Sequence, residues 1–222
     1  MKRLPLLIII FFLFSCQTLP VIDSPVSSDD KNNFACPYPF LKEKYRFVHT
    51  IEAHVAGDMQ SAIIGVTLAN PSADSVSCAI VTAEGMVLFD AESGREAIKV
   101  NRALPPFDTG DFATNMIADI KLIFLAPEGK IQNKGYLTDG STVCRYLEKN
   151  GDLIDVIESE SDGKQVKRYT SSGALKRHVL FNKTTKNIYQ RIELQAYETF
   201  DYSLLMNLIE AQPVKSRAVR RK

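Results

Sequence analysis

The sequence predicts a mainly β protein with one apolar helix, and three observations support this prediction. Apolar and polar residues alternate with period two across residues 45–55, and comparable short runs recur at roughly ten-residue spacing. Turn-forming pairs separate these runs, among them Asn-Gly at 150–151 and Asp-Gly at 162–163. Residues 112–125 instead repeat their apolar side chains at helical spacing. This combination is typical of an antiparallel meander that forms a barrel or a sandwich.

Five strands are expected before the helix. The odd-numbered positions of the first strand share one face, which includes Phe47, His49 and Ile51. Gly57-Asp58 predicts the turn that follows it. Two prolines after Leu104 end this block of strands. The expected strands cover residues 45–55, 61–69, 76–83, 86–90 and 97–101.

A single helix is expected over residues 112–125, between two blocks of strands. Pro127 ends it. The helix has a wide apolar stripe, which consists of Phe112, Met116, Ile117, Ile120, Phe124 and Leu125. A stripe of this width predicts that the helix covers an apolar surface of the sheet.

The second block of strands completes a single domain of about eleven strands. Its strands are expected at residues 141–148, 153–159, 165–170, 174–181, 187–197 and 202–211. The β domain is expected to cover residues 41–212, and a basic disordered tail is expected at 213–222. The tail is either a solvated end or a contact for anionic lipid headgroups or a partner.

The N-terminus has the organisation of an export signal. Lys2 and Arg3 precede the uncharged residues 4–14, which are too few to cross a bilayer as a helix. The following Leu-Phe-Ser-Cys, which ends at Cys16, resembles the bacterial lipobox. That resemblance implies cleavage before Cys16, diacylglycerol on its thiol and an acyl chain on its amino group. We therefore expect a signal peptide at residues 1–15 and a lipidated cysteine with a flexible tether at residues 16–40. Gln17, by resemblance to enterobacterial sorting, favours the outer membrane. The alternative is an ordinary secretory peptide with a chance cysteine.

Residues 17–39 have the composition of a tether. They contain four prolines and a polar run at 27–33, with no apolar period. The alternative, for residues 34–40, is an arm that packs on the domain. Three thiols remain after processing, at Cys36, Cys78 and Cys144, and an oxidising compartment permits one disulfide among them. The sequence leaves both the pairing and its existence open.

The order of elements resembles the LolA/LolB-like superfamily, and within it an uncharacterised family of bacterial outer-membrane lipoproteins. The resemblance covers roughly residues 41–212. It is carried by the lipobox, by the apolar segment 112–125 between two strand blocks and by the closing strand at 202–210. It implies an α+β fold in which an open antiparallel half-barrel is covered by a helix.

A half-barrel of this kind implies a container for acyl chains, because a curved sheet with an apolar inner face can enclose them. The function expected is therefore binding of a lipid or an acylated cargo at the outer membrane, on its periplasmic side. The alternative is that the same residues pack a dry core. The candidate lining residues are Met116, Ile117, Ile120, Phe124, Phe47, Ile51, Ile64, Val66, Leu204 and Met206.

Other classes of function find little support in the sequence. The net charge is +1, which argues against a nucleic-acid-binding face. We expect no catalytic residues, no metal site and no cofactor besides the lipid on Cys16, because no phosphate loop, nucleophile elbow or metal-ligand spacing occurs. No protein partner can be identified. The second hypothesis is an envelope lipoprotein that carries no cargo and acts as a structural or assembly partner.

Overall fold

A computed structural model describes residues 18–25, 34–55, 58–94, 97–185, 188–198 and 201–215. The first half contains the short strand β1 (Ser24–Pro25) and the strands β2 (Tyr45–Val55), β3 (Asp58–Asn70), β4 (Ser75–Val81), β5 (Val87–Ser93) and β6 (Ile98–Ala103). The helix α1 (Phe112–Phe124) follows. The second half contains β7 (Lys130–Tyr136), β8 (Thr142–Leu147), β9 (Leu153–Ser159), β10 (Gly163–Tyr169), β11 (Leu175–Thr185), β12 (Ile188–Tyr197) and β13 (Asp201–Pro213).

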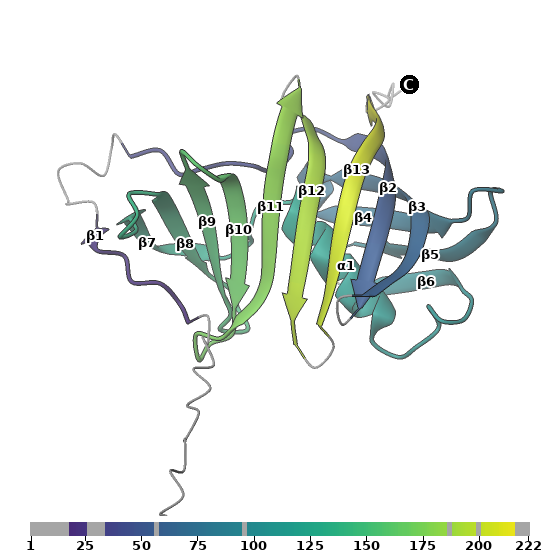
Figure 1. Cartoon of the computed structure of the whole chain (residues 1–222), viewed down its shortest axis with the longest axis horizontal. Helices are drawn as coiled ribbons and strands as arrows, with labels where there is room; N and C mark the ends of the chain where they lie inside the picture. Colours follow the sequence, from purple (N-terminus) through teal and green to yellow (C-terminus); the bar gives the residue numbers. More distant parts are fainter. Residues whose placement is uncertain are drawn as a thin grey trace, which may run out of the picture.

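These strands form one antiparallel sheet in the order β1-β7-β8-β9-β10-β11-β12-β13-β2-β3-β4-β5-β6. The sheet is strongly curved, and its two ends lie far apart with α1 on the concave side (Figure 1). The predicted α+β class, an open half-barrel covered by a helix, is therefore confirmed. The join between the two strand blocks is made by β13, which pairs with β2 and places Met206 opposite Ile51.

The sheet in the described part of the chain has thirteen strands rather than about eleven. The additional strands are β1 and β7. The β7 sequence is mostly polar and exposed, so it has no apolar alternation that could reveal it. Its strand conformation depends on backbone pairing with β8, for example between Gly135 and Val143. The register of long-range pairing is not visible in local sequence patterns.

Helix α1 packs on the concave face over β4, β5 and β6. Its first residue, Phe112, contacts the ring of Phe89 edge-on with 5.2 Å between the ring centroids. At the other end, Phe124 stacks on Phe47 of β2 at 4.9 Å. Each buried side chain of this size contributes about 1.5–3 kcal/mol to the free energy of unfolding. The helix is thus held along its length by the predicted apolar stripe.

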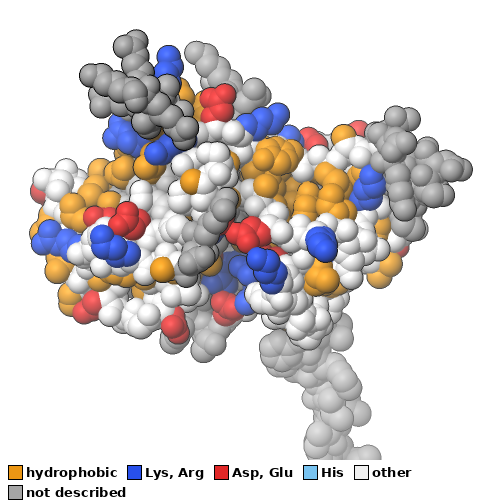
Figure 2. All heavy atoms as spheres, turned by 180° about the vertical axis from the view of Figure 1, so that it is seen from behind, with side chains coloured by type: hydrophobic (Ala, Val, Ile, Leu, Met, Phe, Trp, Pro, Cys, Tyr) orange, Lys and Arg blue, Asp and Glu red, His pale blue; other side chains and the backbone are white. Residues whose placement is uncertain are grey.

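No helix in the described ranges is both long enough and apolar enough to cross a bilayer. Figure 2 shows the molecule from behind, where hydrophobic side chains are exposed in several patches between Lys, Arg, Asp and Glu side chains.

Candidate functional site

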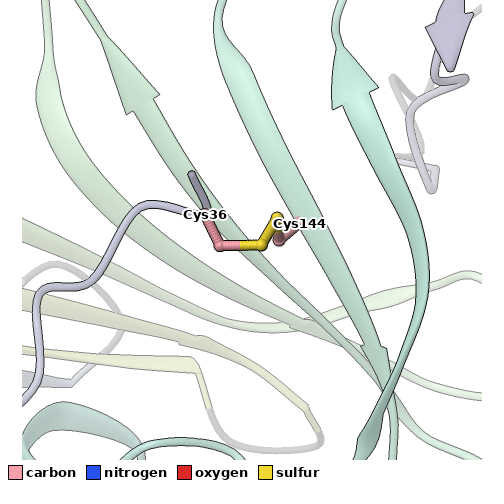
Figure 3. The surroundings of a disulfide bond; sticks show 2 residues. All are labelled: Cys36 and Cys144. Atoms are coloured by element: carbon pink, nitrogen blue, oxygen red, sulfur yellow. A yellow bond between two sulfur atoms is a disulfide. The ribbon is translucent and has the colours of Figure 1, made fainter. Parts of the chain in front are cut away.

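Two described parts of the N-terminal segment lie against the domain. We call Thr18–Pro25 the outer arm and residues 34–41 the inner arm. The outer arm pairs with β7 through β1, and its Thr18 forms a bridge to Ala174. The inner arm is joined to the sheet by a disulfide between Cys36 and Cys144 of β8 (Figure 3). Within residues 16–40, for which we expected a flexible tether, these described stretches are therefore in contact with the domain.

The disulfide resolves the pairing that the sequence left open. Cys78 is the free cysteine of the described residues, and it is buried in β4. Burial raises the pKa of its thiol to about 12, so Cys78 is a neutral packing residue at physiological pH. Cys16, the signal peptide and residues 216–222 of the basic tail lie outside the described residues.

The inner arm continues across the concave side of the sheet beside the end of α1. The Leu41 backbone N–H donates a hydrogen bond to the carbonyl oxygen of Phe124 at 3.1 Å. Phe40 is buried, and its ring meets that of Tyr38 edge-on at 5.5 Å. This part of the arm forms one wall of a large cavity.

The cavity has a volume of about 1180 Å³ and lies between the inner arm, the C-terminal end of α1 and strands β2 and β9 to β12. Typical ligand sites have volumes of about 300–1,000 Å³, so there is space here for a large ligand. The apolar part of the wall is formed mainly by Phe40, Leu41, Tyr45, Phe47, Ile123, Phe124, Phe181, Ile188, Tyr189 and Ile192.

Charged side chains border the same cavity where it opens to solvent. Lys42 and Glu43 follow the inner arm, and both are exposed. Across the opening, Lys164 of β10 forms an ion pair with Glu158 of β9 at 3.7 Å. The cavity therefore combines an aromatic part with a larger polar part, which includes the charged rim and also Gln165, Lys167 and His178 of β10 and β11. Such a site suits an amphipathic molecule that has an apolar part and a polar end.

His49 is a buried polar residue that borders the aromatic interior. It is 1% exposed, and its Nδ1 has no hydrogen-bond partner in the described structure. Its ring lies 5.7 Å from that of Phe47 and 6.2 Å from that of Phe124. Burial lowers the pKa of His49 to about 4, so the imidazole is neutral at pH 7. A neutral ring keeps the interior uncharged.

A buried polar network fixes α1 to the opposite half of the sheet. Arg177 of β11 donates hydrogen bonds to Asp119 of α1 at 2.8 Å and to Glu198 at 2.8 Å. The Tyr202 hydroxyl of β13 donates to the other oxygen of Asp119. Burial raises the pKa of Asp119, while Arg177 and Tyr202 oppose that rise. The network ties α1, β11 and β13 together beside the core.

The predicted lining residues divide into three groups. Phe47 and Phe124 belong to the buried core and also border the cavity. Six others belong to the core or pack against it, namely Met116, Ile117, Ile120, Ile51, Leu204 and Met206. The last two, Ile64 and Val66, pair with Thr50 and Val48 and so lie on the face opposite Phe47. The prediction failed for Ile64 and Val66 because β3 has apolar residues on both faces, and its concave face carries the small residues Gly65, Thr67 and Ala69.

Most of the apolar wall was missed because it comes from two segments that have weak sequence signals. Tyr38 and Phe40 lie in a proline-rich stretch that resembles a linker, although aromatic residues are uncommon in solvated linkers. Phe181 and Tyr189 lie on either side of the β11–β12 turn, and their ring centroids are 4.7 Å apart. The described residues contain no group of three or more His, Cys, Asp or Glu placed to hold a metal ion.

Comparisons with known proteins find similarity at the level of the fold. No family model matches the sequence. No curated protein matches it either. Among solved structures, a LolA superfamily protein from Nitrosomonas europaea aligns with a TM-score of 0.52 and 12% identity, over 80% of this chain and 89% of that one. A Vibrio parahaemolyticus domain whose name refers to outer membrane lipoprotein sorting has a TM-score of 0.43 and 10% identity, over 80% and 88%. The chain thus has a LolA-like fold.

Proposed function

We propose that this protein is an outer-membrane lipoprotein whose half-barrel binds the acyl chain or chains of a lipid or acylated cargo on the periplasmic side. The observation that carries this proposal is the cavity of about 1180 Å³ with its aromatic interior and charged rim. The LolA-like fold supports a carrier or receptor function in lipid or lipoprotein trafficking. It supports binding in preference to catalysis.

The energetics of acyl transfer suit such a cavity. Each methylene moved from water to an apolar environment contributes about 0.8 kcal/mol, so a sixteen-carbon chain gains roughly 12 kcal/mol before the costs of ordering it. The aromatic walls around Phe40, Phe47 and Phe124 offer contacts for the chain. The charged rim, with Lys164 and Glu158, can contact a polar headgroup. The cargo is expected to be held by its tail inside and its headgroup at the rim.

Two features support the proposed location. The Leu-Phe-Ser-Cys sequence that ends at Cys16 resembles the lipobox that directs a lipid anchor, and two or more acyl chains make a stable anchor. The disulfide between Cys36 and Cys144 suits an oxidising compartment such as the periplasm. The covalent lipid would be the protein's only prosthetic group in this proposal.

A second candidate function is that of a structural or assembly partner. The observation that favours it is the edge strand β6, which pairs on one side only with β5 among the described strands. Its side chains are almost all exposed, including Ile98 and Val100. An exposed edge of this kind can accept an extended segment of another protein.

The carrier proposal is tested with the Cys16→Ser form, made in the periplasm without its anchor and purified without detergent. Native mass spectrometry is expected to find an additional mass that delipidation removes and that identifies the class of lipid. Ile188→Trp should reduce this added mass, because Ile188 borders the cavity. Ile98→Trp on β6 is the matched control and should retain it. A clean apo mass, with no uptake of added fatty acid or phospholipid, would contradict the proposal.

A further inference from the structure

The outer arm fixes the point at which the N-terminus meets the domain. Thr18 forms its bridge to Ala174, and the Leu19 N–H donates a hydrogen bond to the carbonyl oxygen of Gly173 at 2.9 Å. Both partners belong to the turn between β10 and β11. A Cβ on Gly173 would lie 3.4 Å from the Cβ of Leu19, so the two backbones are in close contact. The first described residues are therefore seated on this turn.

The rest of the outer arm is held by Arg145 of β8 and then pairs with the edge of β7 through β1. The Arg145 guanidinium donates a hydrogen bond to the carbonyl oxygen of Pro20 at 2.8 Å and forms a two-bond ion pair with Asp155. Asp155 is fully buried, so the ion pair lies beneath the arm. Farther along, the Asp23 N–H donates to Tyr136 at 3.1 Å. The arm thus runs from the β10–β11 turn toward the β7–β8 turn.

This seating limits the position of Cys16. Only Gln17 separates Cys16 from Thr18, and two residues of extended chain span about 7 Å at most. The lipid-bearing residue must therefore lie within about 7 Å of Thr18, which is paired beside the β10–β11 turn. If residues 17–39 were a flexible tether without contacts to the domain, the position of Cys16 relative to the domain would not be limited in this way.

The exposed lining residues of the cavity lie at the other end of the same strands, so the cavity reaches solvent there. Its lining includes Asp139 of the β7–β8 turn, Asp162 of the β9–β10 turn and Ile188 at the start of β12. The strand registers place these residues at one end of the sheet, because Thr142 pairs with Glu158 and Lys164 pairs with Phe181. At the other end, Leu147 and Tyr169 both pair with Leu153, beside the β8–β9 and β10–β11 turns. The β10–β11 turn and the cavity opening are thus separated by the length of β10, seven residues or roughly 23 Å. Figure 1 shows both ends, with β10 and β11 running between them.

We infer that the β8–β9 and β10–β11 turns face the membrane that holds the lipid on Cys16, and that the cavity opens away from that membrane. This inference rests on the proposed function for the lipid anchor and the cargo. The surface that meets the bilayer is the turn at residues 170–174 together with the turn at residues 148–152. Cargo then enters from the aqueous side, from a partner that presents an acyl chain there, and is not drawn directly from the anchoring leaflet.

The test uses the full-length lipidated protein in phosphatidylethanolamine–phosphatidylglycerol vesicles that carry a headgroup acceptor dye. A donor dye is attached at Ser171→Cys, on the β10–β11 turn, or at Glu160→Cys, on the β9–β10 turn, and both positions are exposed. Efficient energy transfer is expected from position 171 and weak transfer from position 160. Equal transfer from both, or the reverse order, would overturn the inference.

The matched control inserts about twelve Gly and Ser residues between Gln17 and Thr18, a linker with a reach of roughly 20 Å. The insertion leaves every described contact in place and should remove the difference between the two positions. A difference that persists would show that the outer arm does not set the orientation. Mass spectrometry of the same samples must find lipid on Cys16, and its absence would also overturn the inference. A protein that is oriented as expected but binds no cargo would refute the carrier proposal alone.

Discussion

The buried imidazole of His49 makes the stability of the fold depend on pH. Its pKa is about 4 in the folded protein and 6.5 when it is exposed. Below pH 6.5 the unfolded chain binds a proton that the folded protein excludes, so stability falls as the pH is lowered toward 4. Removal of the imidazole should remove this part of the pH dependence. The loss between pH 7 and pH 5 should be about 2 kcal/mol smaller in His49→Leu than in the native protein.

Urea unfolding at pH 7 and pH 5 measures this difference. His178 also has a pKa lowered to about 4, by burial and by Lys167, and it contributes to the pH dependence of both proteins. The comparison between the two proteins therefore isolates His49. Equal losses of stability on acidification would refute this interpretation. His178→Gln serves as the control variant, because it should leave the contribution of His49 unchanged.

At the scale of single elements, α1 depends on the ion pair between Asp119 and Arg177. Removing one member of a buried pair leaves the other charge buried without compensation, at a cost of about 3–5 kcal/mol. Asp119→Ala should therefore lower the free energy of unfolding by about that amount, as measured by chemical denaturation. The matched control is Lys121→Ala on the same helix. Lys121 pairs with Asp74 at 2.9 Å in a more exposed position, so its loss should cost about 1 kcal/mol or less.

If Asp119→Ala and Lys121→Ala lowered the free energy of unfolding by similar amounts, the prediction would be wrong. Such a result would mean that Glu198, which also accepts a hydrogen bond from Arg177, compensates fully for the absent carboxylate. The double variant Asp119→Ala, Arg177→Leu distinguishes the cases, because removing both charges should recover part of the stability.

The position of the inner arm depends on the disulfide between Cys36 and Cys144. The bridge links residues separated by 108 positions and holds one wall of the cavity. Replacing Cys36 and Cys144 by Ser should lower stability by about 2–4 kcal/mol and should also reduce lipid uptake, because the arm is released. Thermal unfolding and native mass spectrometry measure the two effects. Cys78→Ser is the control, and it should not reduce uptake. Unchanged uptake after removal of the bridge would mean that the arm is held by its packing alone.

At the scale of elements, local patterns predicted most of the fold. The alternation of apolar and polar residues, together with turn-forming residue pairs, located most strands of both blocks. The helical spacing of apolar residues between Phe112 and Phe124 located the helix. Strand β7 was missed because its residues are polar and its conformation depends on pairing with β8. The inward face of β3 was assigned wrongly because both of its faces contain apolar residues.

At the scale of the whole molecule, the site was harder to predict than the fold. The sequence identifies apolar residues, but it does not distinguish those that fill a core from those that border a cavity. All four of Phe47, Phe124, Ile117 and Ile120 belong to the buried core, but only Phe47 and Phe124 also border the cavity. Which core residues border the cavity depends on the path of the inner arm, because Phe40 of the arm forms part of the cavity wall. The arm and the strands that it faces are far apart in the sequence, so local patterns cannot predict this arrangement.

The pairing of β13 with β2 determines when the half-barrel can be completed during synthesis. The chain is made from its N-terminus, and β2 precedes β13 by nearly the whole length of the domain. The hairpins between β7 and β12 join neighbours in sequence and can form early, because closing short loops is fast. Strand β2 must wait, unpaired with β13, until β13 has been made. During this interval the free edge of β2 is open to pairing with other chains.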